Sequence, residues 1–191
     1  MTEAGYIARW VTPGARVLDL GCGNGTLLKH LWQTRQAPGY GVEIDDAKVQ
    51  ECIRNDVNVL QMDLEDGLSA FQDGSFDFVI LSETLQAIHR QEPLLRDMLR
   101  VGREAIVSFP NFGFWKARLQ ITFAGHMPVS KELPYQWYDT PNVHHCTLVD
   151  FEALCSKLGL RILERQVLTD GSPVSFLPNL FGSLAVYRVS A

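Results

Sequence analysis

The glycine-rich stretch Val17-Leu-Asp-Leu-Gly-Cys-Gly-Asn-Gly-Thr26 constrains the fold more than any other part of the chain. A short apolar run leads into Gly21, Gly23 and Gly25, and a helical pattern follows. Glycines let the backbone turn sharply and approach a ligand closely, and the helix start beyond them supplies free N–H groups. The G-x-G-x-x-G spacing of dinucleotide sites would need glycine at Thr26, and no phosphate-binding G-x-x-x-x-G-K-[ST] loop is present. The stretch predicts a strand–loop–helix ligand site of another kind.

Strand-like and helical patterns alternate around this loop. Helical spacing places Leu27, Leu28, Leu31 and Trp32 on one face after the loop. Such alternation predicts a mostly parallel sheet covered by helices on both faces. The five strands expected in this part are Arg16–Leu20, Gly39–Ile44, Val57–Gln61, Phe76–Leu81 and Ala105–Phe109. Helices are expected near 26–34, 47–54 and 83–100, the last interrupted at Pro93.

The last third of the chain differs in pattern. Thr147-Leu-Val-Asp150 resembles a capping box and begins a helix that Gly159 ends. Two further strands, Leu160–Leu168 and Gly182–Val189, have no helical pattern between them, so we expect them to be antiparallel. The prediction is one α/β domain over residues 1–191: a Rossmann-like, seven-stranded, doubly wound sheet, parallel except for a C-terminal antiparallel hairpin.

Residues 110–147 form an unusually long connection of 38 residues. They include seven of the 19 aromatic residues and four of the nine prolines. A connection of this length within a domain is usually functional or disordered, and this one is too aromatic to be disordered. We expect an inserted aromatic lid or partner surface, with a structural flap over the sheet edge as the alternative.

Charge and cysteine usage exclude several classes of protein. Seventeen basic and 22 acidic side chains give a net charge of −5, and no basic run offers the positive field that nucleic acids or anionic membranes need. The four cysteines form no C-x-x-C pair, which favours unpaired thiols over a metal site or disulfides. The first residues lack the pattern of a signal peptide, and no apolar run reaches the length of a membrane span. We expect a cytoplasmic protein without a bound metal.

Three acidic residues lie at the carboxyl ends of predicted strands, at the edge where doubly wound sheets bind ligands. Asp19 would repel a pyrophosphate but suits a cationic ligand with an ammonium or sulfonium group. Glu43 lies 24 residues further on, near the interval at which such folds place an acid that accepts from ribose hydroxyls. Asp63 follows the third strand. The alternatives are a cap on the loop amides for Asp19, an exposed strand-end charge for Glu43 and an ordinary turn residue for Asp63.

These motifs, with Gly41-Val-Glu-Ile-Asp45 and Phe76-Asp-Phe-Val-Ile-Leu-Ser-Glu83, resemble those of the class I S-adenosylmethionine-dependent methyltransferases. The resemblance implies binding of S-adenosylmethionine or S-adenosylhomocysteine. It implies that the loop and Asp19 hold the methionine end, Glu43 holds the ribose, and Asp63 with Leu64 contacts the adenine. The full set of expected cofactor contacts is Asp19, Gly21, Cys22, Gly23, Gly25, Glu43, Ile44, Asp63, Leu64 and Ser82.

Two longer stretches, 100–113 and 134–144, resemble the MetW family of methionine biosynthesis proteins, and this resemblance extends over nearly the whole chain. It implies an accessory role beside a homoserine O-acyltransferase. The alternative is a methyltransferase that acts on a small-molecule acceptor under the aromatic segment. A catalytic base is not identified from the sequence. His144 and Tyr138 are weak candidates, and a structural role ranks first for the paired His144 and His145.

Overall fold

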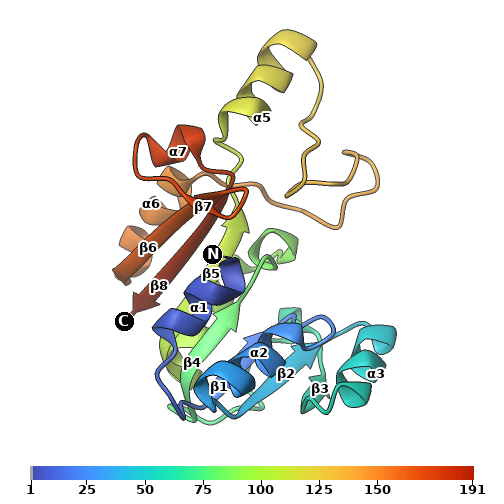
Figure 1. The fold of residues 1–191 in the computed structure, drawn as a ribbon, viewed down its shortest axis with the longest axis vertical. Helices are drawn as coiled ribbons and strands as arrows, with labels where there is room; N and C mark the ends of the chain where they lie inside the picture. The colour runs from blue at the N-terminus through green and yellow to red at the C-terminus, as the bar shows by residue number, and fades with distance from the viewer. Residues whose placement is uncertain (1) are drawn as a thin grey trace.

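The computed structural model describes residues 2–191 as a single eight-stranded sheet with helices on both faces (Figure 1). The strands are β1 Val17–Leu20, β2 Gly39–Glu43, β3 Val59–Gln61, β4 Phe76–Leu81, β5 Gly102–Pro110, β6 Arg161–Thr169, β7 Ser172–Pro173 and β8 Leu184–Ser190. The α-helices are α1 Glu3–Trp10, α2 Thr26–Arg35, α3 Asp46–Arg54, α4 Gln91–Val101, α5 Trp115–Leu119, α6 Leu148–Leu158 and α7 Pro178–Phe181. Short helical turns of other types are η1 Leu64–Asp66, η2 Leu85–Ala87 and η3 Gln120–Ala124.

The strands lie in the sheet in the order β3-β2-β1-β4-β5-β8-β6-β7. Antiparallel pairs occur only among the strands at the β5-to-β7 end of this order. Strands β1 to β5 pair in parallel, whereas β8 runs antiparallel to both β5 and β6. All seven predicted strands are present, and the antiparallel C-terminal pair is confirmed. Because β1 has neighbours on both sides whose helices cross to opposite faces, its carboxyl end lies at the topological switch point where such sheets bind ligands.

The structure corrects three details of the expected architecture. An eighth strand, the two-residue β7, pairs with the end of β6. The connection to β8 contains the four-residue helix α7, which is too short to cross the sheet and so leaves the pairing antiparallel. Trp32 is 53% exposed, because only Leu28 and Leu31 of α2 are buried against the sheet.

Local signals explain several of the helix ends. Asp45 caps α3 by accepting from Lys48 N, and Thr147 with Asp150 forms the predicted capping box of α6. The expected helix over 83–100 is wrong for residues 83–90, where only the turn η2 is helical. The break comes before Pro93, which lies in the first turn of α4. Among the described residues, no helix is both long and apolar enough to cross a membrane.

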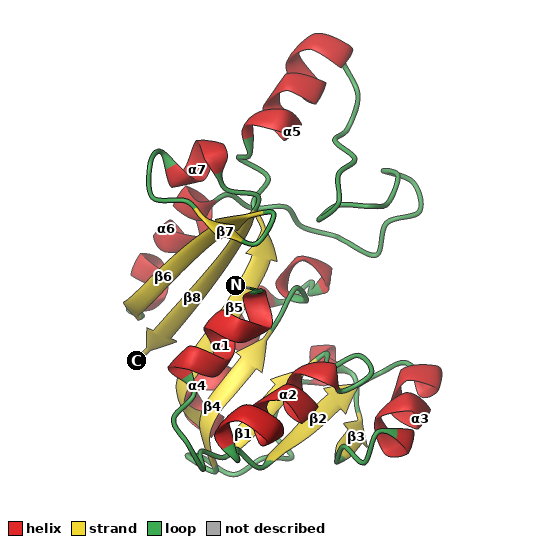
Figure 2. Cartoon of the chain, in the orientation of Figure 1, coloured by secondary structure: helices red, strands yellow, loops and turns green. Residues whose placement is uncertain are grey.

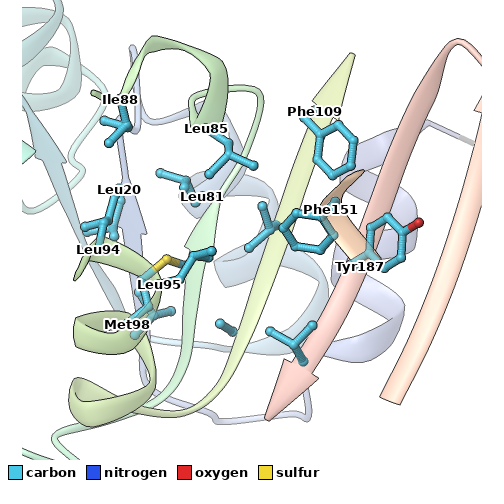
Figure 3. Packing of buried hydrophobic residues seen from close by; sticks show 14 of the residues in the cluster. Leu20, Leu81, Leu85, Ile88, Leu94, Leu95, Met98, Phe109, Phe151 and Tyr187 are labelled. Atoms are coloured by element: carbon cyan, nitrogen blue, oxygen red, sulfur yellow. The ribbon is translucent and has the colours of Figure 1, made fainter. Parts of the chain in front are cut away.

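Two hydrophobic layers hold the sheet between its helices. On one face, Ile7 and Trp10 of α1 and Leu28 and Leu31 of α2 pack over the strands, as the helices in front of the sheet in Figure 2 show. On the other face, α4 and α6 cover a larger cluster (Figure 3). Its aromatic members are Phe109, Phe151 and Tyr187, whose ring centroids lie 4.8–5.9 Å apart.

The segment 110–147 begins with a helical arm that extends beyond the carboxyl end of β5 (Figure 1). Helix α5 continues directly into η3, and the rest of the segment returns as an irregular loop to α6. Ala117 is buried at the base of the arm, and Gln120 exchanges two hydrogen bonds with the backbone of Val129. The arm therefore has its own attachments, while most of its large apolar side chains face outward.

Candidate functional site

The glycine loop forms a tight turn between β1 and α2. Gly21, Gly23 and Gly25 all have positive φ angles, of 69°, 58° and 78°. The N–H groups of Gly21 and Cys22 donate to the carbonyl of Val42, over 2.8 and 3.0 Å. A side chain at Gly23 would meet no atom within 4 Å, so this part of the loop borders open space. The loop is thus a backbone cradle at the carboxyl edge of the sheet.

Asp19 lies beneath this cradle and has no hydrogen-bond partner among residues 2–191. Its side chain is 2% exposed. Burial raises the pKa of its carboxyl group to about 8, and the nearby charges of Glu3 and Glu43 act in the same direction. The alternative role, a cap on the loop amides, is wrong for Asp19, because no backbone N–H of residues 2–191 donates to its carboxyl group. A buried carboxyl group without a partner is costly, which makes Asp19 a candidate for ligand binding.

Glu43 is buried at the end of β2 and ties that strand to the glycine loop. One carboxylate oxygen accepts from the N–H of Gly23 over 2.9 Å, and the other accepts from Ile44 and Asp45 over 3.0 and 3.1 Å. The alternative of an exposed strand-end charge is wrong for Glu43, which is 6% exposed. The structure therefore brings Asp19, Glu43 and the loop together.

The side chain of Cys22 explains why position 41 in β2 is glycine. The Sγ atom of Cys22 lies 3.8 Å from Sγ of Cys52 in α3. A Cβ atom added at Gly41 would lie only 2.3 Å from the same Cys22 Sγ atom. Burial raises the pKa values of both thiols. The side chain of Cys22 thus packs between the loop and β2 and faces away from the open side of the cradle.

We predict that Gly41→Ala lowers the free energy of unfolding by about 1–3 kcal/mol, because the new methyl group overpacks the contact with Cys22. Urea denaturation measures this loss. The double variant Gly41→Ala/Cys22→Ala should recover part of it, since the double variant lacks the clashing sulfur. A single Gly41→Ala variant as stable as the parent would show that this contact relaxes freely.

The predicted adenine contacts lie at the same edge but further out. The Asp63 carboxylate accepts from the N–H of Glu65 over 2.9 Å and so caps η1, as an ordinary turn residue would. Leu64 is half-buried, and Ile44 is 59% exposed. Within residues 2–191, no hydrogen bond or ion pair joins these side chains to Asp19 or the glycine loop, and their part in ligand binding stays a prediction.

A hydrogen-bond network from α1 completes the site. Of its members the sequence indicated only Ser82, as a cofactor contact, and in the structure the Ser82 hydroxyl is bonded to Glu3. Ser82 Oγ donates to Glu3 Oε1 over 2.7 Å, and Ser108 Oγ donates to the same oxygen. The N–H of Glu83 donates to Ser108 Oγ over 2.9 Å. Glu83 has a φ of 47°, a conformation that non-glycine residues rarely adopt outside functional sites. The sequence feature that could have indicated this network is the acidic residue Glu83, shortly after a strand of apolar residues.

The two candidate bases lie away from this network. Tyr138 is 71% exposed and packs edge-on against Trp137. His144 is exposed, and its backbone N–H donates to the carbonyl of Gln86 over 3.0 Å. Its neighbour His145 stacks on Phe112 with 4.8 Å between ring centroids, and partial burial lowers its pKa. Within residues 2–191, no hydrogen bond, ion pair or ring contact joins either candidate to Asp19.

Other hollows of the surface carry less chemistry. One hollow, of about 460 Å³, lies between α2 and the residues that precede β2 and β3, at the opposite edge of the sheet. Trp32, Lys29 and Asn55 line part of it. Within residues 2–191, no three His, Cys, Asp or Glu side chains are arranged to hold a metal ion.

Comparison with known proteins gives a family match over nearly the full chain. The family model described as methionine biosynthesis protein MetW matches residues 2–189. The bifunctional methionine biosynthesis protein MetXA/MetW of Rhodopirellula baltica is 37% identical over 169 residues. That alignment covers 84% of this chain and 27% of the relative, so the chain spans about a quarter of the relative's length.

Solved structures confirm the fold class. An S-adenosylmethionine-dependent methyltransferase of Archaeoglobus fulgidus superposes with a TM-score of 0.72 at 17% identity, covering 98% of this chain and 90% of that chain. Another from Mesorhizobium loti gives a TM-score of 0.70 at 18% identity, with 94% and 92% covered. At this level of identity, the likeness shows a shared methyltransferase fold.

Proposed function

The chain belongs to the MetW family of methionine biosynthesis proteins, and from this premise we propose that it binds S-adenosylmethionine and supports a homoserine O-acyltransferase as an accessory subunit. The proposal has two parts, a cofactor site at the glycine loop and a partner surface on the arm. Each part has its own support and its own experiment.

The residues at the carboxyl edge fit this cofactor. The loop has open space beside Gly23, and the buried carboxyl group of Asp19 has no hydrogen-bond partner among the described residues. An ammonium or sulfonium group would supply the missing positive charge. In the proposal, Glu43 accepts from the ribose hydroxyls in addition to its three backbone N–H groups, and Ile44, Asp63 and Leu64 contact the adenine further out. In this proposal S-adenosylmethionine is a regulatory ligand, and the fraction of the protein that binds it depends on its concentration.

The observation that carries the accessory role is the R. baltica relative, in which MetXA and MetW regions form one bifunctional chain. Joined in one chain, two modules meet at a high effective concentration, as subunits of a complex do. We propose that this protein makes the corresponding contact with a separate homoserine acyltransferase. The arm offers a surface for it, because Trp115, Leu119 and Phe123 recur every four residues and are 38%, 42% and 81% exposed.

Adenosylmethionine is formed from methionine, so its binding here could adjust an early step of the pathway that produces it. For such regulation the cofactor must bind one state of the complex more tightly than another. We therefore expect the acyltransferase to work faster with this protein than alone, and expect S-adenosylmethionine to alter that effect.

The experiment measures acyl transfer to homoserine by the purified acyltransferase with and without this protein, alongside calorimetric titration of S-adenosylmethionine. Glu43→Gln should lower the cofactor affinity about 10–100-fold, because a charged acceptor for the ribose hydroxyls is lost. Glu51→Gln, an exposed acid on α3, is the matched control and should bind as the parent does. An acyltransferase rate that is the same with and without this protein would contradict the accessory role.

One observation favours a second candidate, methyl transfer to a small acceptor. Desolvation and a hydrogen bond to Glu3 raise the pKa of the Glu83 carboxyl group to about 8, so this group is mostly protonated at neutral pH and would act as a base through the fraction that is ionised near pH 8. Transfer of a radiolabelled methyl group to a metabolite extract, lost in Glu83→Gln, would support this candidate. The absence of transfer to any extract would count against it.

A further inference from the structure

Four carboxyl groups from four separate elements converge at the carboxyl edge of the sheet. Glu3 comes from α1, Asp19 from β1, Glu43 from β2, and Glu83 from the residues after β4. Within residues 2–191, none of the four takes part in an ion pair. Asp19 and Glu43 are buried, Glu3 is half-buried and Glu83 is exposed. A buried carboxylate is stable when it is paired, so the buried part of this cluster favours a ligand that brings positive charge.

The four groups differ in how they are satisfied within the protein. Glu43 accepts three backbone N–H groups, and Glu3 accepts two serine hydroxyls. Among residues 2–191, Asp19 has no such partner, and it is almost completely buried beside the open glycine loop. The unpartnered Asp19 is the second observation, besides the acidic cluster itself, that points to a ligand here.

Glu83 is held in place at some strain. Its φ of 47° lies in the left-handed region, and its N–H donates to Ser108, which in turn donates to Glu3. Non-glycine residues keep such a conformation only where their surroundings enforce it, and these places are often functional. The network therefore fixes Glu3 and Glu83 side by side, 80 residues apart in sequence.

Protons stand in for a cation when the ligand is absent. The pKa of Asp19 is raised to about 8 by burial and by the charges of Glu3 and Glu43. The pKa of Glu83 is also raised to about 8, by partial desolvation of a residue that is exposed overall, by a hydrogen bond to Glu3 and by the charges of Glu3 and Glu132, with Lys131 opposing. Near neutral pH the free site accordingly keeps protons on these groups, and a bound cation would expel them.

We infer that the site selects its ligand by positive charge and binds S-adenosylmethionine, a sulfonium, more tightly than S-adenosylhomocysteine, a neutral thioether. This inference rests on the proposed function, which assigns the glycine loop to this cofactor. The two ligands share the adenosine and the amino-acid end with its ammonium group, so contacts with Glu43, the loop and Asp19 cancel in the comparison. The remaining difference is one positive charge next to a cluster of unpaired carboxyl groups.

Such selectivity would suit a sensor of the cofactor. A site that preferred or tolerated the thioether would report the sum of the two compounds. A site that demands the sulfonium reports S-adenosylmethionine itself, whatever amount of the demethylated product is present, because only the charged ligand shifts the population of the bound state.

Calorimetric titration of the full chain at pH 7.5 tests the inference with three ligands. S-adenosylmethionine and sinefungin, an analogue that carries an amine in place of the methylsulfonium group, should both bind at least tenfold more tightly than S-adenosylhomocysteine. Titration in two buffers of different ionisation enthalpy should reveal more protons released by S-adenosylmethionine than by S-adenosylhomocysteine. Equal affinities of the sulfonium and the thioether would overturn the inference and leave cofactor binding intact.

Two variants and a pH series complete the test. Glu3→Gln and Glu83→Gln should each reduce the affinity ratio severalfold, while Glu51→Gln should leave it unchanged. In the parent protein the ratio should rise between pH 6 and pH 9, because the cluster gains negative charge over this range. A ratio that stays flat or falls would overturn the inference even if the variants do not fold. Failure of all three ligands to bind would instead contradict the proposed function.

Discussion

Asp19→Asn is expected to abolish detectable binding of S-adenosylmethionine and, at the same time, to make the free protein more stable above neutral pH. Asp19 is buried without a hydrogen-bond partner among the described residues, and its pKa in the folded protein is raised to about 8. The unfolded chain returns this pKa to its ordinary value of 3.8. Asparagine has nearly the same shape and never ionises, so it removes the cost of this group along with its charge.

The sign of the effect follows from proton linkage. An acid whose folded pKa is raised favours the folded state below its unfolded pKa, and this contribution is lost as the pH rises towards the folded pKa. The parent protein should therefore lose stability between about pH 4 and pH 8, and Asp19→Asn should lose less. Allowing for relaxation around the charge, a gain on the order of 2 kcal/mol at pH 8 corresponds to about 4–8 °C in Tm for a chain of this size.

Thermal denaturation from pH 4 to pH 8 measures this gain, and calorimetry measures the loss of binding. Asp56→Asn is the matched control, because Asp56 is exposed and asparagine tolerates its positive φ. A variant that binds as well as the parent would refute the role of Asp19 in the cofactor site. A variant no more stable than the parent at pH 8 would show that the carboxyl group finds a partner in solution.

Charged side chains on the arm are expected to abolish the complex with a homoserine acyltransferase. We propose the double variant Leu119→Glu/Phe123→Glu, which changes two members of the exposed apolar stripe on α5 and η3. Burying such side chains in an interface contributes about 1.5–3 kcal/mol each, and buried unpaired glutamates oppose association. Binding should weaken at least about 100-fold.

The fold should tolerate the double variant, because both side chains are already exposed and Ala117 supplies the buried contact of the arm. Its Tm and its affinity for S-adenosylmethionine should match those of the parent. Ile53→Glu is the matched control: Ile53 is an equally exposed apolar residue of α3, at the other end of the molecule (Figure 1). Size-exclusion chromatography and calorimetry with the acyltransferase measure the complex. If the double variant bound the acyltransferase as tightly as the parent, the interface would have to lie outside the arm.

Many predictions from the sequence depended on short-range patterns, and these are the ones that the structure bears out. The glycine loop, the alternation of strands and helices, the restart of the chain near Pro93 and the cap at Thr147 are properties of a few consecutive residues. Trp32 shows the limit of such patterns. It shares a helical face with Leu28 and Leu31, but it lies at the margin of the sheet, where no element covers it.

The site divides in the same way. Asp19, Glu43 and the loop could be identified from the sequence, because parallel strands that alternate with helices bring their carboxyl ends to one edge. Glu3 could not, since Ser82 and Ser108 lie 79 and 105 residues away from it in the chain. Its position depends on how α1 packs over β4 and β5, and periodicity within α1 says nothing about which strands it will cross.

The sequence by itself determined the fold class, the family resemblance and the acids that end the first three strands. Only the tertiary structure decided which carboxyl groups are buried, which are satisfied, and which hold a proton near neutral pH. The physical reason is that burial and charge interactions depend on groups distant in the chain, whereas turns, caps and strand patterns depend on neighbouring residues. The assembly of Glu3, Asp19, Glu43 and Glu83 into one uncompensated cluster therefore emerges only when α1 closes over the sheet.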